Sequence, residues 1–84
     1  MIGEIVNLFA AALDDKRFKR HVVGIDVGRP HIDIYNISPS LYLTTLWFHG
    51  DYVSYWLGDC NYNIRYEDVD IPKIAQHIVL YYSS

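Results

Sequence analysis

The stretch LWFHGDYVSYW, residues 46–56, decides the fold of this chain. Its residues alternate around a Gly-Asp pair, and such a pair between two alternating runs is typical of a two-residue β-hairpin loop of type I′ or II′. In this register successive residues point to opposite sides of the hairpin. One side then carries Leu46, Phe48, Val53, Tyr55 and Leu57. The other side carries Thr45, Trp47, His49, Tyr52, Ser54 and Trp56.

The composition of the two sides predicts which of them is buried. The side with Leu46 and Phe48 is apolar, as in a protein core. The other side mixes large rings with hydroxyl groups, which is typical of a binding surface. We therefore expect helices to cover the first side and to leave Trp47, Tyr52 and Trp56 exposed, with on the order of several hundred Å² of ring surface. The alternative is the reverse arrangement, because a slip of one residue exchanges the two faces.

Helical periodicity appears on both flanks of the hairpin region. Residues 2–20 have apolar side chains at a period near 3.6, so we expect a helix that ends in the cationic run Lys16–Arg20, where the helix dipole favours positive charge. Near the other terminus, Asp70 is a good N-cap and Pro72 suits a first helical turn, so a second helix is expected over residues 71–82. Its apolar face comprises Ile71, Ile74, Ala75, Ile78 and Tyr82.

Between the helices the apolar period changes to two. Residues 21–27 and 31–37 read as strands around a turn at 28–30, with Val23, Ile25 and Val27 on one side of the first strand. Two further strands follow at 41–49 and 52–58, and a fifth is plausible at 62–66. We predict the α+β class, with a single small domain over residues 1–84. It consists of an antiparallel meander of four to five strands with N- and C-terminal helices packed on one face.

The length, net charge and cysteine content of the chain limit the classes of function. With 84 residues there is room for one modest core, and the formal charge of −3 argues against a protein that coats nucleic acid. A single cysteine, Cys60, rules out an internal disulfide and fits a cytoplasmic location. No apolar run is long enough for a membrane span, and the first 20 residues do not read as a signal peptide.

No catalytic or metal-binding pattern is present, so we expect a protein that is not an enzyme and needs no cofactor or metal. The four histidines lack metal-ligand spacing, and Cys60 has no second cysteine nearby. A nucleophile pair of Cys60 with His49 or His31 stays open because such pairs are spatial, although a lone turn cysteine is more often incidental. No P-loop, serine motif or dinucleotide-binding loop occurs.

One segment invites an enzymatic interpretation. VVGIDVGRPHIDIYNI, residues 22–37, resembles the first hairpin of ribonuclease H-like nucleases and actin-like ATPases. The resemblance implies that Asp26 would help to hold a divalent metal, with Asp33 or His31 as helpers. Those folds need a longer α/β domain than 84 residues supply, so we favour a plain hairpin with an Asp beside its turn.

Charge is distributed unevenly along the chain. Residues 16–31 are mainly basic, whereas residues 50–70 are mainly acidic and overlap the aromatic hairpin. Acidic groups beside Tyr and Trp suit the capture of a basic protein surface. Each run also has a simpler explanation, since cations favour the end and anions the start of a helix. The run Lys16–Arg20 could also contact nucleic acid.

The profile of a short, acidic, aromatic-rich and cysteine-poor chain is similar to that of bacterial toxin-immunity proteins and other small inhibitors. We therefore predict a non-catalytic intracellular binding protein that neutralises a basic toxin or nuclease by occlusion. The residues expected to bind this partner are Trp47, His49, Asp51, Tyr52, Trp56, Asp59, Glu67 and Asp68. Two alternatives are a homodimeric adaptor packed through Trp47 and Trp56, and, less favoured, a nucleic-acid binder that uses Lys16–Arg20.

Overall fold

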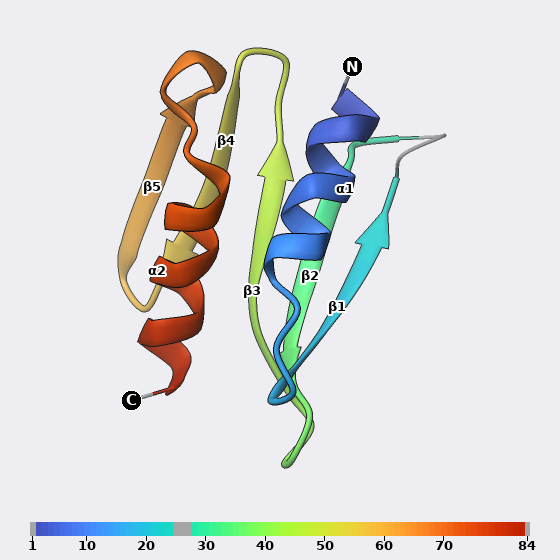
Figure 1. Ribbon diagram of the computed structural model, residues 1–84, viewed down its shortest axis with the longest axis vertical. Coiled ribbons are helices and arrows are strands. Elements are labelled where there is room, and N and C mark those ends of the chain that lie inside the picture. Colours follow the sequence, from blue (N-terminus) through green and yellow to red (C-terminus); the bar gives the residue numbers. More distant parts are fainter. Residues whose placement is uncertain (1, 25–27, 84) are drawn as a thin grey trace.

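Two helices flank five consecutive antiparallel strands in the computed structural model, which describes residues 2–24 and 28–83. The elements are α1 (Ile2–Ala12), β1 (Phe18–Val23), β2 (His31–Asn36), β3 (Leu41–Phe48), β4 (Tyr52–Leu57), β5 (Cys60–Arg65), the short 3₁₀ helix η1 (Tyr66–Asp68) and α2 (Ile71–Ser83). The strands lie in chain order from β1 to β5, and both helices cover the same face of the sheet (Figure 1). The predicted α+β architecture is confirmed, with all five strands present.

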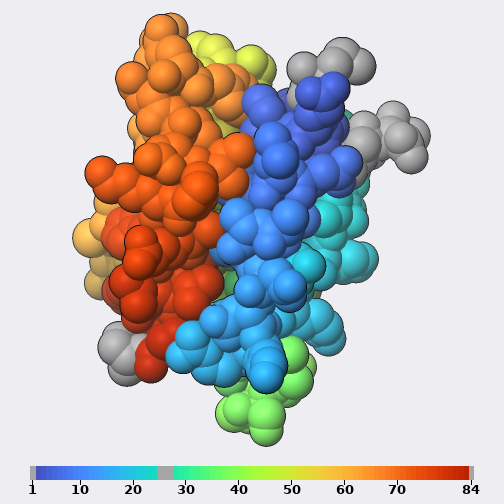
Figure 2. All heavy atoms as spheres, viewed as in Figure 1, coloured from blue at the N-terminus to red at the C-terminus, as the bar shows by residue number. Residues whose placement is uncertain are grey.

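The core lies between the helices and the sheet. α1 contributes Val6 and Phe9, and α2 contributes Ile74, Ala75 and Ile78. The rings of Phe9 and Phe48 meet edge to face, with centroids 5.5 Å apart, and so join the helical layer to the sheet. Figure 2 shows the atoms of the two helices side by side over this face of the molecule.

The hairpin of β3 and β4 has the predicted register. Trp47 lies opposite Ser54 and Phe48 opposite Val53, and the His49 N–H donates to the carbonyl oxygen of Tyr52 at 2.9 Å. The helices cover the apolar side, as expected, and its members are all buried: Leu46, Phe48, Val53, Tyr55 and Leu57. We call the opposite side of the sheet, which neither described helix covers, the open face.

The predicted type of the hairpin turn is wrong, although its length is right. Types I′ and II′ both require a positive φ at Gly50, and Gly50 has none. Tyr66 supports this turn from outside, because its N–H donates to the Asp51 carbonyl and its hydroxyl to the His49 carbonyl. The positive φ occurs instead at Gly58, at +60°, in the two-residue turn that joins β4 to β5.

The first helix is shorter than its periodicity predicts. α1 ends at Ala12, and the run Lys16–Arg20 belongs to a turn and to the start of β1 rather than to a helix end. Phe18 is the reason, because its ring is 7% exposed in the core as the first residue of β1. In β1, Val22 packs against the core. Ile25 and Val27, which were expected on the same side as Val23, lie outside the described residues.

An irregularity between β2 and β3 changes the face of one aromatic residue. Ile34 lies opposite Thr44 and Tyr35 opposite Tyr42, so Leu43 is an extra residue in the ladder. Leu43 packs against the core, and Tyr42 joins Tyr35 and Trp56 on the open face.

The second helix begins as predicted. The Lys73 N–H donates to a carboxylate oxygen of Asp70 at 3.2 Å, which is the N-cap bond. Ile74, Ala75 and Ile78 are buried as expected, while Ile71 and Tyr82 pack on the rim of the core. Within the described residues, neither helix has the length and apolar character to span a bilayer.

Candidate functional site

The open face carries an aromatic centre contributed by the three inner strands, with His49 just beyond the end of β3. Cross-strand pairing aligns His31 of β2 with Trp47 of β3, and Tyr35 with Tyr42. Trp56 and Tyr52 come from β4. The aromatic centre comprises His31, Tyr35, Tyr42, Trp47, His49, Tyr52 and Trp56. The structure therefore brings four of the eight predicted site residues, Trp47, His49, Tyr52 and Trp56, onto one surface.

The tryptophans are half-buried rather than exposed, because neighbouring side chains pack on them. His31 lies against Trp47 with ring centroids 4.3 Å apart, and the Arg29 guanidinium lies 5.9 Å from the Trp47 ring. Tyr42 packs on Trp56 at 6.3 Å. The accessible ring surface is thus smaller than expected, and a partner would meet rings that are already ordered, which lowers the entropy lost on binding.

A second stack lies at the hairpin end of this surface. The rings of His49 and Tyr52 are nearly parallel, with centroids 4.2 Å apart. His49 Nε2 and the Ser54 hydroxyl are 2.8 Å apart and share a hydrogen bond. Both contacts hold the imidazole in place beside the exposed turn that contains Asp51.

A chain of hydroxyl groups lies beneath the aromatic centre. The Thr45 hydroxyl donates to Asp33 Oδ1 at 2.6 Å and lies 2.5 Å from the Tyr42 hydroxyl, which therefore acts as donor to Thr45. His31 Nδ1 donates to the Arg29 carbonyl at 2.9 Å, and its Nε2 lies 3.7 Å from Asp33 Oδ2. These bonds anchor His31 and Tyr42, which pack on the two tryptophans.

The predicted acidic residues do not all gather around the rings. Asp51 lies in the β3–β4 turn, and the bond from Tyr66 N–H to the Asp51 carbonyl brings η1, with Glu67 and Asp68, to the same end of the sheet. Asp59 lies in the β4–β5 turn, at the other end of β4. Burial, and then the charge of Asp51, raise the pKa of the Tyr66 hydroxyl. Asp51 and Glu67 therefore form an acidic end beside Tyr52, with Arg65 between them, whereas Asp68 lines a groove on the helical side of the sheet.

One cation reduces the charge of this acidic end. Arg65 Nε lies 2.7 Å from a carboxylate oxygen of Glu67, and both side chains are largely exposed. An exposed pair of this kind adds little stability, so each group stays available to another partner.

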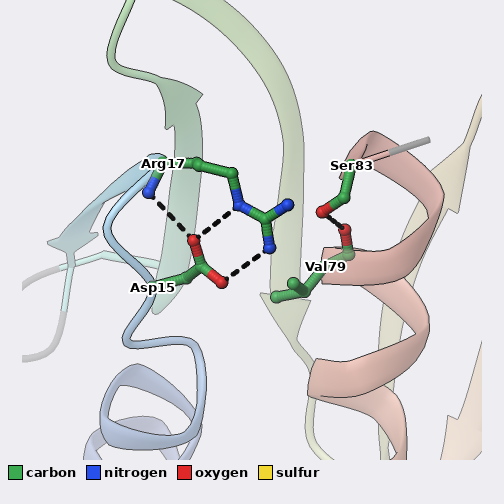
Figure 3. Close-up of polar contacts among 4 residues, drawn as sticks. All are labelled: Asp15, Arg17, Val79 and Ser83. Carbon is green, nitrogen blue, oxygen red and sulfur yellow. Dashed lines mark hydrogen bonds and ion pairs between the residues drawn. The ribbon is translucent and has the colours of Figure 1, made fainter.

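The run Lys16–Arg20 is not one basic surface. Asp15 accepts bonds from the backbone N–H and the guanidinium of Arg17 (Figure 3), and these bonds lower the pKa of its carboxyl from 3.8 to about 2. Arg20 points to the helical side of the sheet and lies 3.4 Å from Asp14. Lys19 lies on the open face, with its ammonium 5.6 Å from the Tyr35 ring.

The residues considered for catalysis are not assembled into a site within the described part of the chain. Asp26 lies outside it. Cys60 is exposed opposite Leu57, whereas His49 lies at the other end of β4. Among the described residues, no group of three or more His, Cys, Asp and Glu side chains could hold a metal ion.

Several residues of the open face were absent from the predicted site. His31, Asp33 and Tyr35 alternate with the buried Ile32 and Ile34, so the period of two in HIDIYNI could have placed them on one side. Nothing in the sequence shows that this side continues the tryptophan face. Comparison of the chain with protein-family models, curated proteins and solved structures gives no match.

Proposed function

We propose that this protein is a small non-catalytic binding protein of the inhibitor or immunity type, which neutralises a protein partner by covering it with the open face. The observation that carries the proposal is the aromatic centre of the open face, which contains both tryptophans. Figure 1 shows that both helices lie on the other face of the sheet. Trp and Tyr are enriched among the residues that dominate protein interfaces, especially where their rings are held in place before binding.

The proposed partner is a basic protein such as a toxin or nuclease in the cytoplasm. The acidic end formed by Asp51 and Glu67 adjoins Tyr52, which stacks on His49, so a partner seated on the rings would also face these two carboxylates. Charges at the rim of an interface mainly raise the association rate. In this proposal the rings supply affinity and the acidic end supplies steering, while Asp59 is not part of the contact.

The test compares two double variants after capture and identification of a partner. Trp47→Ala/Trp56→Ala removes the centre of the surface, and each lost ring is worth about 2 kcal/mol, so affinity for the purified partner should fall at least hundredfold. Ile37→Ala/Leu41→Ala is the matched control, because both side chains are exposed but lie outside the aromatic centre, in the β2–β3 connection and at the first residue of β3. Calorimetry on circular-dichroism-checked proteins measures both affinities. Equal affinity for the tryptophan variant and wild type would refute the proposal.

A second candidate is a binder of single-stranded nucleic acid. Its support is that Lys19 and Arg29 lie against Tyr35 and Trp47, which places cations beside rings on which bases could stack. Binding of a fluorescent oligonucleotide should then weaken steeply with salt, and Lys19→Ala/Arg29→Ala should reduce both affinity and salt slope. Lys73→Ala, which removes an exposed lysine of α2 on the helical side, is the control. Salt-independent or absent binding eliminates this candidate.

A further inference from the structure

The two outer edges of the sheet differ in how they are protected against pairing with another strand. β1 carries Lys19, Arg20 and His21 along its length, and charged side chains discourage such pairing. β5 has no charged residue from Cys60 to Ile64 and no proline, and its six pairs with β4 run without a register shift. Within residues 2–24 and 28–83, β4 is the only strand that pairs with it. The outer edge of β5 is therefore a regular template for a further strand.

A groove of about 550 Å³ runs beside this edge on the helical side, with mainly apolar surface and with charged side chains such as Asp68 and Lys73 in its lining. α2 covers β5 only in part, so Tyr62 and Ile64 stay half-buried on the groove floor. Leu80 of α2 lines the groove and is 59% exposed. A strand added to β5 would cover apolar surface here as well as form backbone hydrogen bonds.

We propose that the outer edge of β5 pairs with β5 of a second copy of this chain. In an antiparallel pair of strands, residues directly opposite each other point to the same face of the sheet. The two-fold axis must therefore lie beside one residue of β5, which then faces the same residue of the second copy. With the axis at Tyr62, the two Tyr62 rings meet, Cys60 faces Ile64 of the second copy, and Asn61 faces Asn63 of the second copy. The pairs thus match apolar with apolar on the groove side and amide with amide on the open face.

Charge complementarity selects this axis. With the axis at Tyr62, Arg65 lies opposite Asp59 of the second copy, and the two-fold symmetry gives this ion pair twice. Both residues are exposed, and the present partner of Arg65 is the exposed Glu67. An axis at Asn63 would instead bring Asp59 opposite Glu67 of the second copy, which opposes two carboxylates.

The dimer is one continuous sheet with all four helices on one side. The Leu80 side chains of both copies share the joined groove, and the two open faces lie together on the other side. The aromatic centre stays free in each copy, so this inference does not rest on the proposed function.

Analytical ultracentrifugation over a range of concentrations tests the pairing. Wild type should approach twice the mass of one chain as concentration rises. Arg65→Glu and Asp59→Lys should each raise the dissociation constant by roughly tenfold, because two ion pairs become two like-charge pairs. The combined variant Asp59→Lys/Arg65→Glu should restore the dimer, and circular dichroism checks that each single variant folds. Lys16→Glu, the same charge reversal far from β5, should leave the dissociation constant unchanged.

A cross-link tests the register. Ile64→Cys should form an intermolecular disulfide with Cys60 of the second copy, whereas Asn63→Cys points to the other face and should not. Wild type should not cross-link, because the two Cys60 positions lie four residues apart along the pair, on the order of 13 Å. The inference would be overturned by a monomer at every concentration or by a dimer that Arg65→Glu does not weaken. It would also be overturned by equal cross-linking of both cysteine variants or by loss of the dimer in Trp47→Ala/Trp56→Ala.

Discussion

At the residue scale, two buried threonines organise the strands beneath the rings. The Thr44 hydroxyl donates to the Trp56 carbonyl at 2.7 Å, and Thr45 connects Tyr42 to Asp33. Within the described residues, no buried side-chain nitrogen or oxygen lacks a hydrogen-bond partner. A satisfied buried network favours one arrangement of its members, so these bonds hold the open face in a single conformation.

Thr45→Val should destabilise the fold by about 1–3 kcal/mol, because the variant keeps the shape of the side chain but leaves the Tyr42 hydroxyl and Asp33 without their shared partner. Urea unfolding measures the change. Ser40→Ala, in the exposed β2–β3 connection, serves as the control and should unfold like wild type. A threonine variant as stable as wild type would show that the network adds nothing to the fold.

The lowered pKa of Asp15 predicts that the stability of the fold depends on pH. Its pKa is lowered from 3.8 to about 2 by Arg17, so the interaction stabilises the fold above about pH 4 and is lost as the pH falls to about 2. Asp15→Asn should therefore lower the urea midpoint at pH 6, and its difference from wild type should shrink as the pH falls and be mostly lost near pH 2. A constant difference across this range would contradict the assignment.

At the scale of elements, one helix boundary depends on a local contact and another on a contact between residues far apart in the fold. α2 begins where Asp70 caps its N-terminus, a bond between residues three apart in the chain. α1 ends before Asp14 and Asp15 because Phe18 is needed in the core as the first residue of β1. A local signal is therefore sufficient for the start of α2, whereas the end of α1 depends on a distant contact.

Asp70→Ala should cost about 1 kcal/mol of stability, since the N-cap carboxylate satisfies the Lys73 N–H. Thermal or urea unfolding followed by circular dichroism measures the loss. Asp70→Ser keeps a capping group and should recover most of the stability. If the serine and alanine variants were equally unstable, the effect would come from charge rather than from the cap.

At the scale of the whole molecule, a single core joins three parts of the chain. α1 contacts β1, β2 and α2, and the Tyr82 hydroxyl of α2 donates to the Leu43 carbonyl of β3 at 3.2 Å. Phe48, 1% exposed, lies in the sheet against Phe9 of α1. Loss of packing at this position should therefore weaken both layers together.

Phe48→Ala should cost about 3–5 kcal/mol, because it removes a buried ring and leaves a cavity under α1. A domain of this length has about 4–13 kcal/mol of total stability, so the variant should be close to unfolded at room temperature. Phe48→Leu should retain much more stability, and unfolding by circular dichroism and by tryptophan fluorescence should coincide in wild type. Separate transitions by the two probes would show that the layers unfold independently.

The sequence by itself determined the hairpin register, the contrast between its two sides and the start of α2. These features are local, because a two-residue loop sets the pairing of its flanks and a cap acts within one turn. Only the tertiary structure decided where α1 ends, how the extra residue Leu43 brings Tyr42 to the open face, and that Asp59 lies apart from the other carboxylates. Each of these depends on which strands are neighbours, and contacts between distant residues leave no periodic signal in a single sequence.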